Sequence, residues 1–316
     1  MKIPGATIVQ LDKMPGENEI QKWGLTDYVG AVTDGTYGAV GFDFKSPHTG
    51  LAAKKVWFFF DKTYVCLGTD ISSRMKNQVL TTVNQCLLNG QVTVSDADGI
   101  HPQERGSRMK KGVRWVVHDR VGYYFLNKEN VILSNQRTEG SWKIANRQTT
   151  TPTDIIQQDV FTLSVDHGSY PNNEGYAYMV VPSADPLSIE KQVEEEGVVV
   201  LANCPDVQAV RHDGLNMAYA VFYKGGTLRI HDKIVVEMDS PGMLMVKYND
   251  AGEILTLGVS DPTRFMKKLH LSVNQRIVGT AQENIQTEWD GKQALTRISV
   301  DLPQNEYAGK SVIYNK

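Results

Sequence analysis

A short aromatic run with a second apolar run close behind it constrains the fold more than any other stretch of this sequence. Val56 to Phe60 reads VWFFF, and the apolar run Tyr64 to Leu67 follows after a three-residue polar turn. Two runs of about five residues around a polar turn are typical of a β-hairpin, and runs without polar alternation indicate strands buried on both faces. A helix is disfavoured because the runs are short and rich in aromatic and β-branched residues. We therefore predict a buried hairpin within residues 50–70, with other strands covering both of its faces.

Most of the remaining chain offers further short strands between turn residues. Asn89-Gly90 predicts a type I′ hairpin between two of these strands, and Asp119-Arg120 is the predicted turn of another pair. About fifteen strands at roughly 8–12-residue spacing, with almost no helix, indicate a sandwich or barrel. The predicted strands of the first half include Val79 to Leu88, Gln91 to Val94, Val113 to His118, Gly122 to Leu126, Ser141 to Asn146 and Val160 to Val165.

One segment differs from this pattern of short strands and turns. Pro186 to Glu196 reads PLSIEKQVEEE and predicts a short helix, whose acidic cluster we interpret as a solvated face. The sequence therefore predicts an all-β chain in two domains. A large antiparallel β-sandwich occupies residues 1–184, a helical connector residues 185–196, and a smaller C-terminal β-sandwich residues 197–316.

Composition excludes several functional classes. The net charge of −3 gives no electrostatic case for nucleic acid or an anionic membrane as partner. No run approaches the ~18 apolar residues of a membrane span, and residues 1–30 lack the charged start and apolar core of a signal peptide. The three cysteines, Cys66, Cys86 and Cys204, do not occur in a metal-ligand spacing. We expect Cys66, which lies inside an apolar strand, to be a buried free thiol.

No composite catalytic motif is present, so isolated histidines are the candidates for acid–base chemistry. His167 lies in the stretch DHGSYP, before the predicted strand that contains Tyr176. It could exchange a proton beside a tyrosine, or it could pack at a sheet edge while Asp166 hydrogen-bonds backbone amides in a turn. His118 and His212 each precede an aspartate in similar turns, where a structural role is the simpler interpretation.

Carboxylates gather in an early loop. Glu17, Glu19 and Asp27 lie within eleven residues, and Tyr28 follows directly. Carboxylate and backbone carbonyl oxygens are the ligands that Ca²⁺ prefers, although this spacing is not that of an EF-hand. The stretch therefore predicts either a calcium site or a loop of solvated charges.

Aromatic and basic residues suggest contacts with an acidic sugar chain. Trp23, in a polar loop, is a candidate exposed platform for a sugar ring, and Arg105 and Arg108 begin a basic stretch that could bind carboxylate or sulfate groups. Trp115 and Trp142 are further candidates for stacking on sugars. Trp57 lies inside the aromatic run, where packing in the core is the expected role.

Several stretches together resemble the β-sandwich part of polysaccharide lyase family 8, which contains chondroitin AC, hyaluronate and xanthan lyases. The similarity keeps the same order along essentially the whole chain, and the chondroitin AC branch is the most similar. It is carried by KIPGAT, TDGTYGAVGFDF, LAAKKVWFFFD, WVVHDRVGYYFL, DHGSYPNNEGYAYMVVP and LANCPDVQAVRHDG.

The resemblance implies a galactose-mutarotase-like super-sandwich followed by a small sandwich, and it implies where catalysis occurs. Family enzymes cleave uronic-acid polysaccharides by β-elimination, with Asn, His, Tyr and Arg residues in a helical α/α toroid that this sequence does not match. We therefore assign no catalytic residue here. The resemblance also implies a structural Ca²⁺ held by Glu17, Glu19, Asp27 and Tyr28, and a secreted or periplasmic location.

Three hypotheses follow from the sequence. The first is a truncated, β-sandwich portion of a family 8 lyase that binds acidic polysaccharide such as chondroitin or hyaluronan and is inactive without a separate toroid. The second is an active lyase that uses His167 with Tyr176. The third is a stand-alone carbohydrate-binding module.

Overall fold

The computed structural model describes residues 2–13, 16, 23–277 and 282–316. It is nearly all β, with 57% strand and 6% helix, which confirms the predicted fold class. Within the described residues, neither of the α-helices has the length and apolar character that crossing a membrane requires.

The chain forms two compact units that each draw on separate stretches of sequence. The first unit combines Met1–Ile20, His48–Leu51 and Ser72–Ile189, and the second combines Gln21–Pro47, Ala52–Ile71 and Glu190–Lys316. The sequence prediction divides the chain only once, near residues 185–197, and that domain boundary stays a prediction.

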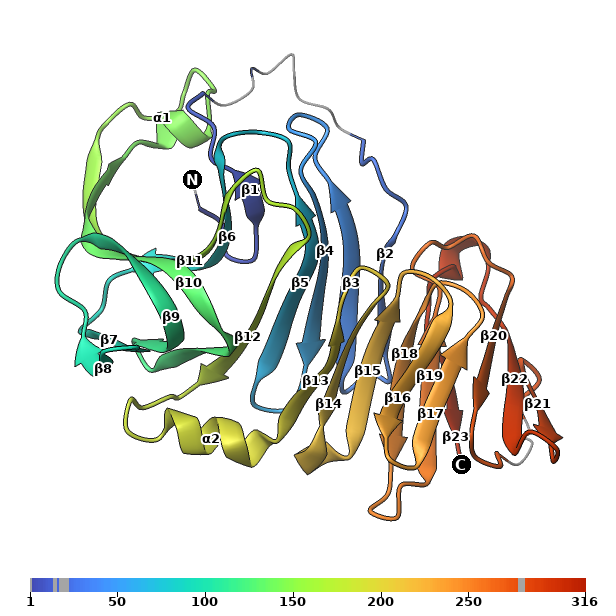
Figure 1. The fold of residues 1–316 in the computed structure, drawn as a ribbon. Helices are drawn as coiled ribbons and strands as arrows, with labels where there is room; N and C mark the ends of the chain where they lie inside the picture. Colours follow the sequence, from blue (N-terminus) through green and yellow to red (C-terminus); the bar gives the residue numbers. More distant parts are fainter. Residues whose placement is uncertain (1, 14–15, 17–22, 278–281) are drawn as a thin grey trace. The chain divides into compact units, whose positions relative to one another are not determined.

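The first unit is built on long antiparallel strands. Its sheet has the strand order β1-β6-β11-β10-β12, and β9 pairs with both β10 and β7. Its elements are β1 (Thr7–Val9), β6 (Gln78–Leu87), β7 (Val92–Asp96), β8 (Gly99–Pro102), β9 (Ser107–His118), β10 (Val121–Gly140), α1 (Trp142–Ala145), β11 (Ile156–Ser169) and β12 (Glu174–Pro182) (Figure 1).

Turn residues set some of these connections and mislead about others. His118 pairs with Val121 across Asp119 and Arg120, which both have positive φ, so the predicted β9–β10 hairpin is confirmed. The hairpin predicted at Asn89-Gly90 is wrong, because β6 pairs with β1 and β11, and β7 pairs with β8 and β9. Each of the two strands forms its backbone hydrogen bonds with other strands, so the turn residues between them do not produce a hairpin.

The predicted strand at Ser141–Asn146 is also wrong. The Ser141 side chain accepts a hydrogen bond from the Lys143 N–H and caps the short helix α1. Serine at the N-cap satisfies one of the free N–H groups of a first helical turn. None of the residues of α1 is buried, so a cap rather than packing explains its conformation.

The second unit contains three sets of antiparallel strands, and two of these sets are built from its C-terminal stretch, Glu190–Lys316. One is the run β5-β4-β3-β2, one has the order β13-β14-β15-β18-β19-β23, and one has the order β16-β17-β20-β22-β21; we call the last two sheet B and sheet C. Its strands are β2 (Val29–Thr33), β3 (Gly38–Lys45), β4 (Ala52–Phe59), β5 (Tyr64–Ser72), β13 (Val198–Asn203), β14 (Val207–His212), β15 (Met217–Phe222), β16 (Gly226–His231), β17 (Ile234–Met238), β18 (Gly242–Tyr248), β19 (Ile254–Ser260), β20 (Lys268–Val273), β21 (Ile285–Asp290), β22 (Leu295–Asp301) and β23 (Val312–Asn315).

Sheet B lies between the other two sheets of this unit. Phe58 of β4 packs against Tyr219 of β15 with ring centroids 5.9 Å apart, and the opposite face of sheet B shares an apolar core with sheet C. Every residue of β15 is buried, as expected for a strand covered on both faces. Close packing also explains Gly41, because a Cβ there would lie 3.0 Å from the Val221 side chain.

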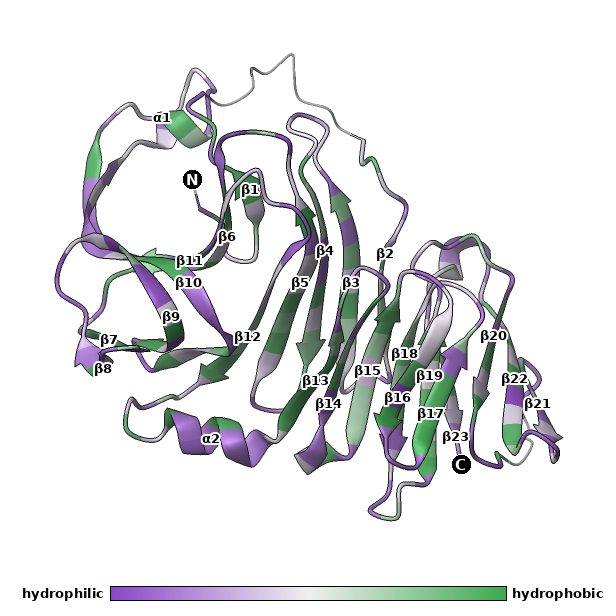
Figure 2. Cartoon of the chain, in the orientation of Figure 1, coloured by the Kyte–Doolittle hydropathy of each residue, from purple (hydrophilic) through white to green (hydrophobic). Residues whose placement is uncertain are grey.

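The aromatic hairpin forms as predicted, but its two strands differ in burial. β5 is buried along most of its length, whereas β4 mixes buried and partly buried residues and ends at Phe59, which is 42% exposed. Strands β3, β4 and β5 run side by side, and the β4 run is partly hydrophobic in Figure 2. At the end of β4, the face that meets sheet B is covered at Phe58, whereas the opposite face is open at Phe59.

The predicted helix forms as α2 (Ile189–Glu196), and its role as a connector between domains stays a prediction. Figure 2 shows mostly hydrophilic residues along it, and Glu194 and Glu195 are exposed, as expected for a solvated face. Glu196 differs from them, because its Oε2 lies 2.9 Å from Nε2 of the buried His212.

Candidate functional site

The early loop of the second unit is anchored by Tyr28. Its phenol donates a hydrogen bond to the Phe222 carbonyl at 2.8 Å, and its ring lies 4.8 Å from that of Tyr223. Burial raises the pKa of the Tyr28 phenol well above its usual range. The Tyr28 carbonyl accepts the N–H of Asp43 at 2.9 Å, so the side chain fixes a backbone oxygen beside a carboxylate.

The carboxyl group of Asp43 lies near this loop in a partly buried, negatively charged environment. Burial raises the pKa of the Asp43 carboxyl, the Lys54 ammonium opposes this rise, and the carboxylates of Asp70 and Asp27 add to it. Lys54 Nζ lies 3.4 Å from an oxygen of Asp70. Mutual repulsion of this kind is relieved when a cation binds. Asp43 and Asp70 come from β3 and β5, so the early loop alone could not have revealed them.

Two of the four predicted metal ligands lie within the described residues. Asp27 is exposed and Tyr28 is placed as above, while Glu17 and Glu19 lie outside the described residues. Among the residues that the structure does describe, no group of three or more His, Cys, Asp or Glu side chains is close enough to hold a metal ion. Calcium stays a prediction.

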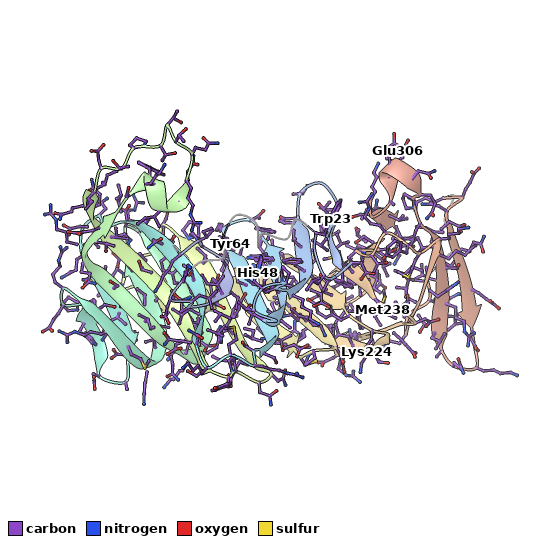
Figure 3. The ribbon with its side chains drawn as sticks, turned by 90° about the horizontal axis from the view of Figure 1, so that it is seen from above. Trp23, His48, Tyr64, Lys224, Met238 and Glu306 are labelled. Atoms are coloured by element: carbon purple, nitrogen blue, oxygen red, sulfur yellow. The ribbon has the colours of Figure 1, made fainter. Side chains whose placement is uncertain are left out.

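The tryptophans divide between surface and core. Trp23 is 82% exposed and lies at the surface in Figure 3, consistent with an open platform. Trp142 on α1 is also exposed. Trp115 is fully buried, so its suggested role in stacking on sugars is wrong; it lies on a face of β9 that packs inward. Trp57 is half-buried, with the Lys55 ammonium 5.3 Å from its ring centroid.

The basic stretch of the first unit is less positive than its sequence suggests. Arg105 lies 2.5 Å from Asp159, and Arg108 lies 2.5 Å from Glu104. Lys110 bonds Asp96 at 2.9 Å, largely shielded from solvent. Exposed ion pairs contribute little to stability, so an anionic ligand could exchange with the carboxylates of the two arginines. Whether Arg105 and Arg108 bind substrate stays a prediction.

His167 has a structural environment. Its Nε2 lies 2.8 Å from the Thr81 hydroxyl, which bonds the Thr7 hydroxyl at 2.7 Å. The Tyr176 ring is 6.1 Å from the imidazole, and both side chains are buried. Asp166 accepts the Gly168 N–H at 2.9 Å, as the turn interpretation expects. This arrangement joins three strands of the sheet and favours the structural role.

His118 is held in the neutral form. Its Nε2 accepts the N–H of Asn89 at 3.0 Å, and its ring stacks on Phe161 with centroids 4.3 Å apart. Burial lowers the pKa of this imidazole. A ring buried as an acceptor and packed on an aromatic side chain stabilises the β9–β10 turn region rather than exchanging protons with a substrate.

Comparison with known proteins matches this architecture along the chain. The super-sandwich domain of polysaccharide lyase family 8 matches residues 1–193, and the C-terminal β-sandwich domain of the same family matches residues 199–270. This chain belongs to polysaccharide lyase family 8.

Individual family 8 proteins support the same conclusion. Chondroitinase-AC of Pedobacter heparinus is 34% identical over 314 residues, which are 98% of this chain and 41% of that protein. A hyaluronate lyase of Thermasporomyces composti is 28% identical over 98% of this chain and 39% of its own length. A solved chondroitinase AC lyase, studied in complexes with oligosaccharides, superimposes with a TM-score of 0.84 over 99% of this chain and 43% of that one. This family 8 chain thus spans about 40% of the length of these relatives.

Proposed function

We propose that this chain is the β-sandwich portion of a family 8 lyase that acts on an acidic, uronic-acid polysaccharide such as chondroitin or hyaluronan. The 34% identity to a chondroitinase-AC across 98% of the chain carries the proposal. In the elimination, a base takes the C5 proton of the uronate, the freed electron pair forms a C4–C5 double bond, and the C4–O bond breaks as the leaving oxygen gains a proton.

The proposed contribution of this chain is to support and bind, while a helical toroid supplies the proton-transfer groups. Exposed Trp23 presents a flat apolar face to a sugar ring. Arg105 and Arg108 could bind acidic groups of the polysaccharide when these groups replace the carboxylates that now pair with the two arginines. The buried settings of His118 and His167 argue against a catalytic pair within the β-structure. On its own, the chain is therefore expected to bind without turning over.

Two measurements on the chain as it stands test this proposal. Incubation with chondroitin sulfate and with hyaluronan should give no rise in ultraviolet absorbance from the unsaturated product. Titration with the same polymers should give saturable binding that weakens as salt increases, since the ligand is a polyanion. Turnover that is lost in His167→Ala would replace the proposal with the His167–Tyr176 mechanism. Absence of both turnover and binding would remove the proposed role in substrate binding.

We further propose that the early loop holds a structural Ca²⁺. Asp27 and the carbonyl of Tyr28 would contribute ligands, together with Glu17 and Glu19. The support is the raised pKa of the Asp43 carboxyl, which burial causes and the carboxylates of Asp70 and Asp27 increase, together with the hydrogen bond that holds the Tyr28 side chain. Hard oxygen donors of this kind suit Ca²⁺, which would join the loop to the strands behind it.

Calcium should raise the thermal stability of the chain. A ligand at a hundred times its Kd stabilises the folded state by about 2.7 kcal/mol, so we expect the unfolding temperature in 1 mM CaCl2 to exceed that in chelator by about 5–10 °C. Differential scanning calorimetry measures this shift. Asp27→Asn should abolish it, whereas Asp232→Asn, an exposed aspartate elsewhere in the same unit, should preserve it. An equal shift in both variants would place calcium somewhere else.

A further inference from the structure

Sheet C carries a groove on the face that points away from the apolar core. The groove encloses about 620 Å³ and is lined from β17, β20, β21 and β22. Leu271 and Ile298 belong to the core between the sheets, so Ser272 and Ser299, their neighbours in sequence, lie on the outer face. These two small side chains lie on the floor, between His270 and Arg297 of the same two strands and the longer side chains of the flanking strands β17 and β21.

The strand register shows how the walls are arranged. On β17, β20, β22 and β21 respectively, one row across the sheet consists of Glu237, Ser272, Arg297 and Glu288. The serine thus lies between a carboxylate on one side and a guanidinium and a second carboxylate on the other. Polar groups therefore flank the floor on both sides along this row.

A second row crosses the groove beside the first. It consists of His270, Ser299 and Gln286, on β20, β22 and β21. Asp239, which also lines the groove, extends it on the other side, because its N–H donates to the His270 carbonyl at 3.1 Å. The floor therefore presents two hydroxyls on neighbouring strands, each beside planar polar side chains.

The groove has one side chain that is already fixed. The Arg297 guanidinium lies 3.0 Å from Asp290 and 2.7 Å from the side-chain oxygen of Gln293. Its charge is therefore balanced by a carboxylate, while Glu237, Asp239 and Glu288 add negative charge to the lining. A polyanionic chain would be repelled here, in contrast to the ligand proposed for the rest of the protein.

We propose that this groove on sheet C binds a neutral glycan chain. Carboxylate, amide and guanidinium groups each present two hydrogen-bonding atoms in one plane, which matches pairs of neighbouring sugar hydroxyls. Several such groups are spread over four neighbouring strands, so they could contact successive rings of a sugar chain. Binding at this groove would tether the protein to a neutral polysaccharide.

Calorimetric titration of the full chain tests the proposal. The probes are neutral hexasaccharides of β-1,4-linked glucose, mannose and xylose, together with desulfated, carboxyl-reduced chondroitin; chondroitin sulfate serves as the acidic comparison. At least one neutral probe should bind with a Kd of about 1 mM or tighter. In the double variant S272Q/S299Q, longer side chains fill the floor, and binding of that probe should weaken by about tenfold or more.

A matched control separates loss of the groove from general damage. Thr227→Gln introduces the same side chain on β16 of the same sheet, at an exposed position opposite Glu237, and should leave the Kd unchanged. Circular dichroism and the unfolding temperature confirm that each variant is folded. Failure of every neutral probe to bind, or unchanged binding in folded S272Q/S299Q, overturns the proposal. Binding of chondroitin sulfate is measured in the same series and should not change in S272Q/S299Q, so failure of the groove and failure of the proposed function give different results.

Discussion

Replacing Phe58 by alanine should lower the free energy of unfolding by about 3–5 kcal/mol, the usual cost of removing a buried aromatic ring. Phe58 has no exposed surface and packs against Tyr219 in the centre of the second unit. The cavity would open between β4 and sheet B, whose other face is covered by sheet C, so the surrounding structure has little room to collapse. Urea unfolding followed by tryptophan fluorescence measures the loss as a lower transition midpoint.

The neighbouring residue is the control. Phe59 points to the opposite face of the same strand and is 42% exposed, so Phe59→Ala should cost about 1 kcal/mol or less. Both variants remove the same atoms from the same aromatic run. Equal losses would mean that the two faces of β4 are equally covered in solution, contrary to the burial pattern described above.

This difference between Phe58 and Phe59 shows what the sequence could predict of the fold. An unbroken aromatic run indicates a strand, but it contains no information about which face receives a covering layer. That layer is set by Tyr219 and the other residues of sheet B, which occur much later in the chain. The sequence therefore predicted the hairpin correctly, whereas the predicted burial on both faces holds for most of β5 and fails at Phe59 of β4.

Local signals failed where distant partners or caps decided the outcome. Asn89-Gly90 has the residues of a tight hairpin turn, yet the hydrogen bonds of β6 go to β1 and β11. Ser141 to Asn146 has apolar residues at strand-like spacing, yet the Ser141 cap starts a helical turn there. Asp119-Arg120 succeeded because the two strands beside it pair with each other.

The candidate sites show the same division. Trp23 was predicted to be exposed from its polar neighbours, and it is. The carboxylate partners of Arg105 and the carboxylates around Asp43 come from other strands, so the sequence around each residue could not reveal them. The groove on sheet C depends on register between four strands, which no single segment of sequence contains.

Replacing Lys55 by methionine should stabilise the protein at pH 7 by about 2–3 kcal/mol. Lys55 is only 4% exposed, and burial lowers the pKa of its ammonium from 10.5 to about 8. A depression of that size means that burial destabilises the protonated form of Lys55, relative to its neutral form, by about 3 kcal/mol. The free energy of unfolding is lower by that amount at pH values where Lys55 is protonated. Methionine keeps a similar length without the charge and gives up the contacts of the ammonium, among them about 0.5–1 kcal/mol of attraction to the Trp57 ring.

The pH dependence of this gain identifies its cause. Between pH 8 and 10.5 the unfolded chain keeps the Lys55 proton while the folded chain has released it, so the stability of the unmodified protein rises with pH in that window. Lys55→Met lacks this rise, and its advantage should be largest below pH 8 and disappear above about pH 10.5. Urea unfolding of both proteins at several pH values measures the difference. Lys45→Met, at the exposed end of the neighbouring strand β3, should show no such trend. A pH-independent gain in Lys55→Met would assign the effect to packing and leave the buried ammonium without an energetic cost.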